Sequence, residues 1–192
     1  TGIVMEYKDN VLGNNVFQKL QQTVKNDKLP WFFNNATSYT DSATPDDFSF
    51  SHLVVQNGEV YSSLAPFLEA CVLNALDSIG EPIQDLLRIR LGLITCAATS
   101  TTHSPHVDYE HPHKSGLIYL NDADGDTVFY DQFYDNTSGM HSQDYSKEQS
   151  FTVHKAVTPK ANRIAWFNGL RFHASSTTTT VDRRLVLNFN YV

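Results

Sequence analysis

Residues 166–192 read WFNGLRFHASSTTTTVDRRLVLNFNYV, and the end of this stretch alternates polar and apolar side chains. Successive side chains of an extended strand point to opposite faces. If Arg184 faces inward, Val186, Asn188 and Asn190 do so too. The opposite face is then apolar and consists of Leu185, Leu187, Phe189 and Tyr191. The stretch therefore predicts a strand with a polar inner face and an apolar outer face that packs against helices.

Other short apolar runs, rich in β-branched and aromatic residues, come before this strand and predict further strands. They span residues 89–94, 116–120, 127–130, 151–157 and 163–167. Two amphipathic stretches, residues 11–27 and 64–79, predict helices earlier in the chain, and the second ends at Gly80. Helices first and strands later indicate an α+β, mainly β arrangement in which helices cover one face of a sheet or flattened barrel.

The chain has 192 residues, of which 41% are hydrophobic, enough for one sizeable core. We therefore expect a single domain over residues 1–192. Residues 1–85 are predicted to form a helical support region, and residues 86–192 to form the β core. The polar stretch from Asn34 to Asp47 is predicted to be an ordered loop or hairpin.

A formal net charge of −7 argues against a sequence-independent grip on nucleic acid, which needs a basic surface. The two cysteines, Cys71 and Cys96, lack CxxC spacing and are too few for a disulfide framework, which favours a reducing compartment. The sequence has no run of eighteen apolar residues and no signal-peptide pattern at its start. We expect a soluble, unexported protein of the cytoplasm.

The segment HVDYEHPH, residues 106–113, places two metal-binding side chains two positions apart. In an extended chain His106 and Asp108 project to the same face. His173 is the candidate third ligand, from a strand that the fold brings nearby. Two histidines and one carboxylate bind Fe(II) on one side and leave positions open for a bidentate oxoacid and dioxygen.

An arginine near the last strand is the candidate group for holding the far carboxylate of such an oxoacid. Its planar fork pairs with a carboxylate through two parallel hydrogen bonds. Arg183 and Arg184 are both available. Strand alternation favours Arg184, because an inward Arg183 would turn Asn188 and Asn190 against the helices as unpaired amides. The spacing from His173 also fits Arg183, so both stay candidates.

The order of these motifs resembles that of the 2-oxoglutarate/Fe(II) oxygenases, and most closely their prolyl-4-hydroxylase-like branch. The resemblance is confined to residues 86–192. The pieces that carry it are His106-Val107-Asp108, Tyr119-Leu120-Asn121, Asp124 to Phe129, Arg171-Phe172-His173-Ala174 and Arg184 to Phe189. The sequence departs from the family pattern at Asp124, where glycine is usual, and at Asp126, where glutamate is usual.

The resemblance implies a double-stranded β-helix, or jelly-roll, with a metal between its two sheets. It implies a dioxygenase that hydroxylates a C–H bond while 2-oxoglutarate becomes succinate and CO2. His106, Asp108 and His173 would bind the Fe(II) cofactor. The substrate would be a peptidyl proline, another protein side chain or a small molecule, and the acidity of the chain disfavours a nucleobase.

The resemblance also implies a pocket for 2-oxoglutarate, the co-substrate. Tyr119 would donate its hydroxyl to the distal carboxylate beside Arg184 or Arg183. Thr127, Asn188 and Leu117 would line the same pocket. Tyr109 and Glu110, which follow the metal ligands, are candidate substrate contacts.

Other polar segments have simpler interpretations. His103, His111 and His113 are interpreted as solvated loop residues, with a zinc site or substrate contact as the alternatives. The run SSTTTT at 175–180 is interpreted as a flexible hairpin loop. Residues 130–149, polar with interspersed aromatics, are typical of a loop that carries specificity.

Two other classes of protein fit parts of the sequence. A cupin-like metal-binding jelly-roll without oxygenase activity would share the histidine-rich site but would not need an arginine after His173. A β-sandwich binding module or a viral coat-type domain would need none of the motifs in order. Binding of 2-oxoglutarate distinguishes the oxygenase hypothesis from both.

Overall fold

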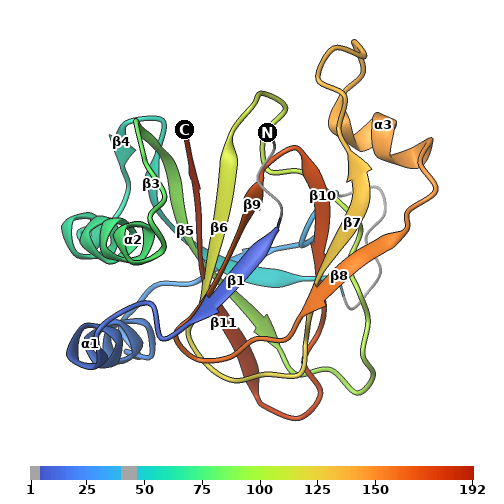
Figure 1. The fold of residues 1–192 in the computed structure, drawn as a ribbon. Helices are drawn as coiled ribbons and strands as arrows, with labels where there is room; N and C mark the ends of the chain where they lie inside the picture. The colour runs from blue at the N-terminus through green and yellow to red at the C-terminus, as the bar shows by residue number, and fades with distance from the viewer. Residues whose placement is uncertain (1–4, 40–46) are drawn as a thin grey trace.

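The computed structural model describes residues 5–39 and 47–192, and its strands form two antiparallel sheets that face each other (Figure 1). The larger sheet has the order β1 (Glu6–Asp9), β9 (Arg163–Asn168), β6 (Lys114–Tyr119), β11 (Arg183–Tyr191), β5 (Leu86–Thr95), β3 (Ser49–Gln56) and β2 (Phe32–Asn34), with β4 (Glu59–Val60) paired to β3. The smaller sheet has the order β10 (Arg171–Ser175), β7 (Thr127–Phe133) and β8 (Val153–Val157). Two facing antiparallel sheets confirm the predicted mainly β jelly-roll.

The segment before the HxD motif extends the smaller sheet. Isolated bridges join Thr102 to Ser176 and His106 to His173, so this segment runs antiparallel beside β10. His106 and His173, the first and last of the predicted metal ligands, therefore lie side by side on the smaller sheet.

The helices α1 (Asn14–Val24) and α2 (Ala65–Ile79) pack on the outer face of the larger sheet, on the left in Figure 1. The apolar face of β11 lies in the core that these helices close, as the alternation predicts; its members are Leu185, Leu187, Phe189 and Tyr191. Gly116 on β6 is needed here, because a Cβ at this position would lie 2.1 Å from the Phe189 ring. Gly80 ends α2 in the left-handed conformation, with φ 72°.

The predicted order of helices first and strands later is wrong for the first 85 residues. They contain β1, β2, β3 and β4, which are four of the eight strands of the larger sheet. The side chains of β1, β2 and β4 are mostly exposed, so these strands lack the apolar pattern that reveals a buried one. Of the loop predicted at residues 34–47, positions 40–46 lie outside the described residues.

Two further cores complete the packing. Between the sheets lie Met5, Leu117, Tyr119, Phe129, Val157, Ala165, Phe167 and Val186. Outside the smaller sheet, α3 (Ser142–Lys147) contributes Tyr145, which stacks on Phe172 at 6.3 Å between ring centroids. The stretch predicted as a specificity loop, residues 130–149, thus includes the end of β7 and this short helix.

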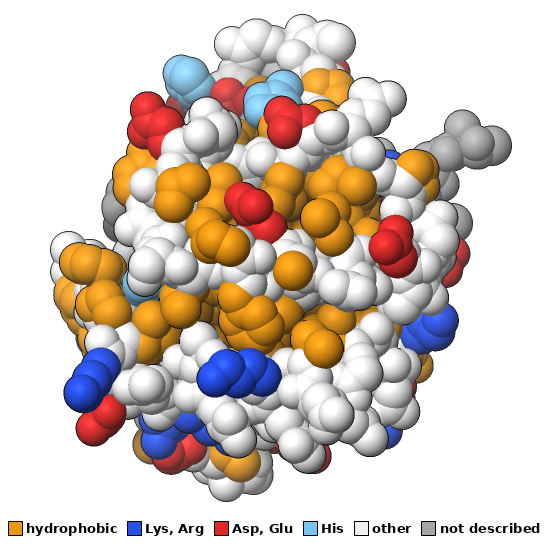
Figure 2. Space-filling view, turned by 90° about the vertical axis from the view of Figure 1, so that its left-hand side faces the viewer, with side chains coloured by type: hydrophobic (Ala, Val, Ile, Leu, Met, Phe, Trp, Pro, Cys, Tyr) orange, Lys and Arg blue, Asp and Glu red, His pale blue; other side chains and the backbone are white. Residues whose placement is uncertain are grey.

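Figure 2 looks onto the side that carries α1 and α2 and shows hydrophobic side chains grouped across this face. Exposed hydrophobic residues on elements of this side include Val16 of α1, Val60 of β4 and Leu73 of α2. No helix among residues 5–39 and 47–192 combines the length and apolar character needed to cross a membrane. Cys71 is buried and Cys96 is exposed, and both are free thiols.

Candidate metal centre

Backbone hydrogen bonds hold two of the predicted ligands side by side. The amide of His106 donates to the carbonyl of His173 at 2.9 Å, and the amide of His173 donates back at 3.0 Å. The two imidazole rings lie 4.5 Å apart between centroids. Their alignment is therefore part of the sheet.

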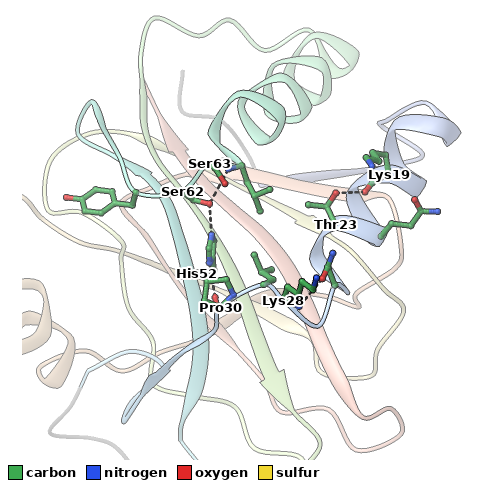
Figure 3. Close-up of a pocket in the computed structure, with 12 residues that line it drawn as sticks. Lys19, Thr23, Lys28, Pro30, His52, Ser62 and Ser63 are labelled. Atoms are coloured by element: carbon green, nitrogen blue, oxygen red, sulfur yellow. Dashed lines mark hydrogen bonds between the residues drawn. The ribbon is translucent and has the colours of Figure 1, made fainter.

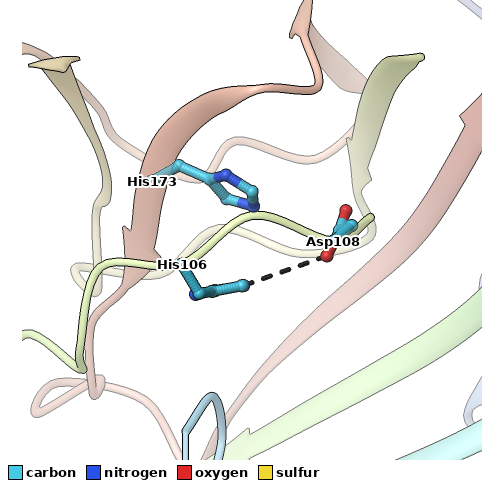
Figure 4. A group of neighbouring side chains, drawn as sticks. All are labelled: His106, Asp108 and His173. Atoms are coloured by element: carbon cyan, nitrogen blue, oxygen red, sulfur yellow. Dashed lines mark ion pairs between the residues drawn. The ribbon is translucent and has the colours of Figure 1, made fainter. Parts of the chain in front are cut away.

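Asp108 completes a compact cluster with these histidines (Figure 4). One ligand atom from each of the three residues lies within 4.8 Å of the others, and Nε2 of His106 is 3.9 Å from Oδ1 of Asp108. Among the described residues this is the one group of three or more His, Cys, Asp or Glu side chains with metal-binding spacing.

Each imidazole is oriented by the backbone through the nitrogen that faces away from the cluster. Nδ1 of His106 lies 3.3 Å from the carbonyl of Ser104, and Nδ1 of His173 lies 3.2 Å from that of Arg171. A proton on Nδ1 leaves Nε2 free as a metal-binding lone pair. Burial, with the neighbouring His173, lowers the pKa of His106 to about 4, and burial lowers that of His173 as well. Both rings are therefore neutral at pH 7, as metal ligation requires.

Asp108 is buried, and its carboxylate is held by three neighbours. Arg88 lies 3.0 Å from Oδ1, while Asn190 donates to Oδ2 at 2.8 Å and Ser115 donates to it at 3.4 Å. Burial opposes ionisation, but Arg88, the two histidines and the hydrogen bond from Asn190 together outweigh it and hold the pKa of Asp108 well below its usual range. The cluster thus offers two neutral imidazoles and one ionised carboxylate, a donor set suited to Fe(II).

Arg184 lies inside the fold, 2% exposed, near this cluster. Its Nε donates to the carbonyl of Gly125 at 2.8 Å, and its Nη2 donates to Oγ1 of Thr127 at 2.7 Å. The hydroxyl of Tyr119 also donates to Oγ1 of Thr127, at 2.7 Å. Because Thr127 accepts both bonds, its own proton is available to donate to a ligand.

A single narrow pocket of about 70 Å³ joins the histidines to this arginine. His106, His173 and Arg184 all line it. The predicted residues Thr127, Asn188 and Leu117 line it as well. Gly92 on β5 also lines the pocket, and a Cβ at this position would lie 3.2 Å from the Val186 side chain.

The structure does not place Arg183 in this pocket. Its side chain is 48% exposed and pairs with Asp182, with Nη2 2.6 Å from Oδ2. Neighbouring residues of a strand point to opposite faces, so an inward Arg184 forces Arg183 outward. Of the two arginine candidates, only Arg184 reaches the pocket.

The run SSTTTT is a well-bonded segment and not a flexible loop. Ser176, Thr177 and Thr178 are buried. Both oxygens of Asp124 accept hydrogen bonds from this run, including the amides of Thr179 and Thr180. The adjacent Gly125 packs so closely that a Cβ would lie 2.5 Å from the carbonyl of Ser176. The unusual aspartate in the family motif therefore anchors the segment that follows β10.

The two predicted substrate contacts do not line the pocket. Glu110 is directed toward α3, where Oε1 accepts from the amide of Ser142 at 2.6 Å. The ring of Tyr109 packs under the guanidinium of Arg88 at 5.3 Å. Both residues pack around the cluster of His106, Asp108 and His173.

Two of the histidines interpreted as solvated are buried. His103 is 4% exposed and its Nδ1 lies 2.9 Å from Oγ of Ser175, while His113 is 6% exposed and packs against Gly169. His111 is exposed, as predicted. The loop folds back on β10, which sequence spacing does not reveal.

Sequence reasoning missed the arginines of β5 and the buried amide of β11 as parts of the site. Arg88 and Asn190 bind Asp108, and Arg90 lines the pocket. A signal was present in the run RIRLGL, residues 88–93, where two arginines alternate with apolar residues in a strand otherwise suited to burial.

A second pocket, of about 530 Å³, lies between α1 and the segment before α2 (Figure 3). His52 projects into it, with Nε2 2.7 Å from Oγ of Ser62 and Nδ1 2.8 Å from the carbonyl of Pro30. Ser62 also accepts the amide of Leu64 at the start of α2. These bonds tie β3 to α2 and give His52 a structural role.

Solved structures show where this architecture occurs. An oxidoreductase of the 2OG-Fe(II) oxygenase family from Burkholderia pseudomallei matches with a TM-score of 0.60 and 14% identity, covering 98% of this chain and 84% of that one. A prolyl hydroxylase from Trichoplax adhaerens, in complex with a hypoxia inducible factor peptide, matches with a TM-score of 0.58 and 12% identity, covering 97% and 82%. HygX from Streptomyces hygroscopicus, with nickel and 2-oxoglutarate bound, matches with a TM-score of 0.55 and 12% identity, covering 97% and 82%.

No protein-family model matches the sequence, and a search of curated proteins finds no significant match. The fold is nevertheless defined: a double-stranded β-helix with two histidines and an aspartate between its sheets. It is the fold of the 2-oxoglutarate/Fe(II) oxygenases, prolyl hydroxylases included.

Proposed function

We propose that the protein is an Fe(II)- and 2-oxoglutarate-dependent dioxygenase that hydroxylates a C–H bond of its substrate. The observation that carries this proposal is one pocket lined both by His106 and His173 and by the buried Arg184. A metal-binding group and a carboxylate-binding group at the two ends of one cavity suit a ligand that chelates a metal through one end and carries an anionic tail.

His106, Asp108 and His173 would hold the Fe(II) through two Nε2 atoms and a carboxylate oxygen. When bound, Fe(II) and 2-oxoglutarate supply the chemistry that oxidises a C–H bond with dioxygen, giving succinate and CO2. The protein supplies orientation and charge. Ser104 and Arg171 hold the imidazole tautomers through their carbonyls, and Asn190 orients Asp108.

Arg184 would pair with the distal carboxylate of 2-oxoglutarate, since a buried guanidinium forms strong charge-assisted hydrogen bonds. Thr127 and Tyr119 place two hydroxyls beside it. Leu117 and Val186 form apolar walls along the pocket, where they would keep water from the reacting centre.

The substrate in this proposal is a peptide residue such as proline or a small molecule. Both kinds occur with this fold: the Trichoplax enzyme is in complex with a peptide fragment, and HygX has been solved with hygromycin B bound. A cytoplasmic location and the action of residues 1–192 as one domain stay predictions.

The alternative is a cupin-like metal-binding protein without oxygenase activity. It would bind a metal at the same three ligands but would not need Arg184 buried in the pocket. The buried arginine therefore favours the oxygenase.

The test is turnover by protein that is reconstituted with Fe(II) under anaerobic conditions and then exposed to dioxygen. We expect slow conversion of 2-oxoglutarate to succinate even without the true substrate. Asp108→Ala and His173→Ala should lose both the metal and the conversion. A protein that holds metal but neither binds nor converts 2-oxoglutarate would contradict the proposal and support the cupin-like alternative.

A further inference from the structure

Arg90 is a partly buried cation in the candidate active site, and its Nε has no hydrogen-bond partner. Its Nε is enclosed and donates to no acceptor among residues 5–39 and 47–192. Arg88 and Arg184, its neighbours in the site, each bind an oxygen of the protein. A partly buried guanidinium that donates few hydrogen bonds is costly to the fold, so its presence in the site points to a function.

The strand register places Arg90 at the metal end of the pocket. On the paired strands β5 and β11, Ile94 is opposite Arg184 and Arg90 is opposite Asn188. Four residues of a strand separate the two arginines along β5 and β11, roughly 13 Å at 3.3 Å per residue. The two cations therefore serve opposite ends of the pocket.

The strand β3 borders the pocket on the side of β5. β5 pairs with β3, whose residues Ser49, Phe50 and Ser51 line the pocket and are partly exposed. Tyr119 and Leu117 lie on β6, across β11 from this side. On β3, Ser51 is opposite Gly92 and Leu53 is opposite Arg90, so Arg90 lies two residues along β5 from the nearest serine of the pocket.

The charges around the pocket are unbalanced toward positive. Among the described residues that line the pocket there is no Asp or Glu, whereas Arg90 and Arg184 both line it. Asp108 is already paired with Arg88. Burial, with the charge of Arg88, lowers the pKa of Arg90 only to about 10, so the guanidinium is charged at pH 7. If the distal carboxylate of 2-oxoglutarate pairs with Arg184, Arg90 is still without a carboxylate partner in the pocket.

We propose that Arg90 binds a carboxylate group of the substrate and so selects substrates that carry a carboxylate close to the oxidised C–H bond. This inference rests on the proposed function and names the substrate class of the same site. The planar fork of arginine matches a carboxylate through two parallel hydrogen bonds. Ser51 of β3, opposite Gly92, lines the same pocket.

The test compares wild type, Arg90→Met, Arg90→Lys and Arg184→Met, all loaded with Mn(II). Calorimetry measures 2-oxoglutarate binding. Thermal unfolding then measures binding of acetate, the carboxylate probe, against its neutral analogue acetamide, with and without 2-oxoglutarate.

We expect Arg90→Met to keep 2-oxoglutarate affinity within about threefold, while its acetate affinity falls about thirtyfold, the lower range for loss of a buried charge pair. Arg90→Lys should keep part of the acetate effect. The ligand-free Arg90→Met protein should unfold at the same temperature as wild type or higher, because no hydrogen bond is lost. A merely structural arginine would lower it.

Two outcomes overturn the proposal. If Arg90→Met weakens 2-oxoglutarate binding as much as Arg184→Met does, Arg90 holds the oxoacid and not the substrate. If acetate stabilises wild type and Arg90→Met equally, Arg90 binds no carboxylate. Should wild type bind no 2-oxoglutarate at all, the proposed function fails, and the acetate comparison without oxoacid still decides the role of Arg90.

Discussion

Nη2 of Arg88 lies 3.0 Å from Oδ1 of Asp108, the same carboxylate oxygen that faces Nε2 of His106 at 3.9 Å. A metal ion bound between the histidines would share that oxygen with the guanidinium. Arg88 therefore balances the buried carboxylate, and we expect it to compete with a metal ion for the same oxygen.

Replacing Arg88 by methionine should make the metal-free protein less stable and more dependent on metal. Loss of one partner from a buried ion pair costs about 3 kcal/mol. Mn(II) should then raise the unfolding temperature of Arg88→Met by more than it raises that of wild type, because the ion takes over the carboxylate. Arg183→Met, which removes an exposed pair, is the control and should change little. An equal metal-induced gain in wild type and Arg88→Met would contradict the competition.

The metal-free protein should lose stability as pH falls from 6.5 toward about 4. The pKa of His106 is lowered from 6.5 to about 4 by burial, so the unfolded chain takes up a proton that the folded site refuses. The contribution of neutral His106 to the free energy of unfolding is complete above pH 6.5. It decreases as the pH falls to about 4, by about 3 kcal/mol at most. Urea unfolding over this range should show a shallower decline for His106→Gln. An unchanged decline would mean that other buried histidines dominate.

Arg184→Met should keep the metal and lose at least about thirtyfold in 2-oxoglutarate affinity, since a buried charge pair with the ligand disappears. Arg183→Met is the matched control, one residue away and exposed, and its affinity should equal that of wild type. Calorimetry on Mn(II)-loaded proteins measures both. Reversal of the two results would contradict the assignment from strand orientation.

Asp124→Asn should loosen the segment that follows β10. The hydrogen bonds from Thr178, Thr179 and Thr180 hold the pKa of Asp124 below its usual range, which indicates that they favour the ionised form. Hydrogen exchange should become faster at the amides of Thr179 and Thr180. Asp126→Asn, two residues along, is the control. Unchanged exchange in Asp124→Asn would show that the segment is held by its other contacts.

The sequence was sufficient to predict that His106, Asp108 and His173 come together, and to predict the orientation of β11. Strand alternation depends only on the local chain, so the inward Arg184 and the outward Arg183 follow from the burial of Leu185 and Leu187. The helix α2 was predictable for the same reason, because its apolar face and its terminal Gly80 are local signals.

The missed features depend on contacts between distant parts of the chain. β3 belongs to the larger sheet through its pairing with β5, although Ser49, Ser51 and His52 interrupt its apolar pattern. The ordered run after Ser175 depends on Asp124, which lies on another loop. Arg90 could be assigned no role from spacing, because its significance is the lack of a partner in the folded protein.

The reciprocal backbone hydrogen bonds between His106 and His173 fix where these two residues lie, whatever side chains they carry. Exchanging either imidazole for a carboxylate or a thiolate leaves these bonds in place, because they use only main-chain atoms. Metal preference follows donor type and geometry. The bridge therefore makes this jelly-roll a scaffold on which the preference for one transition metal over another can be redesigned one side chain at a time.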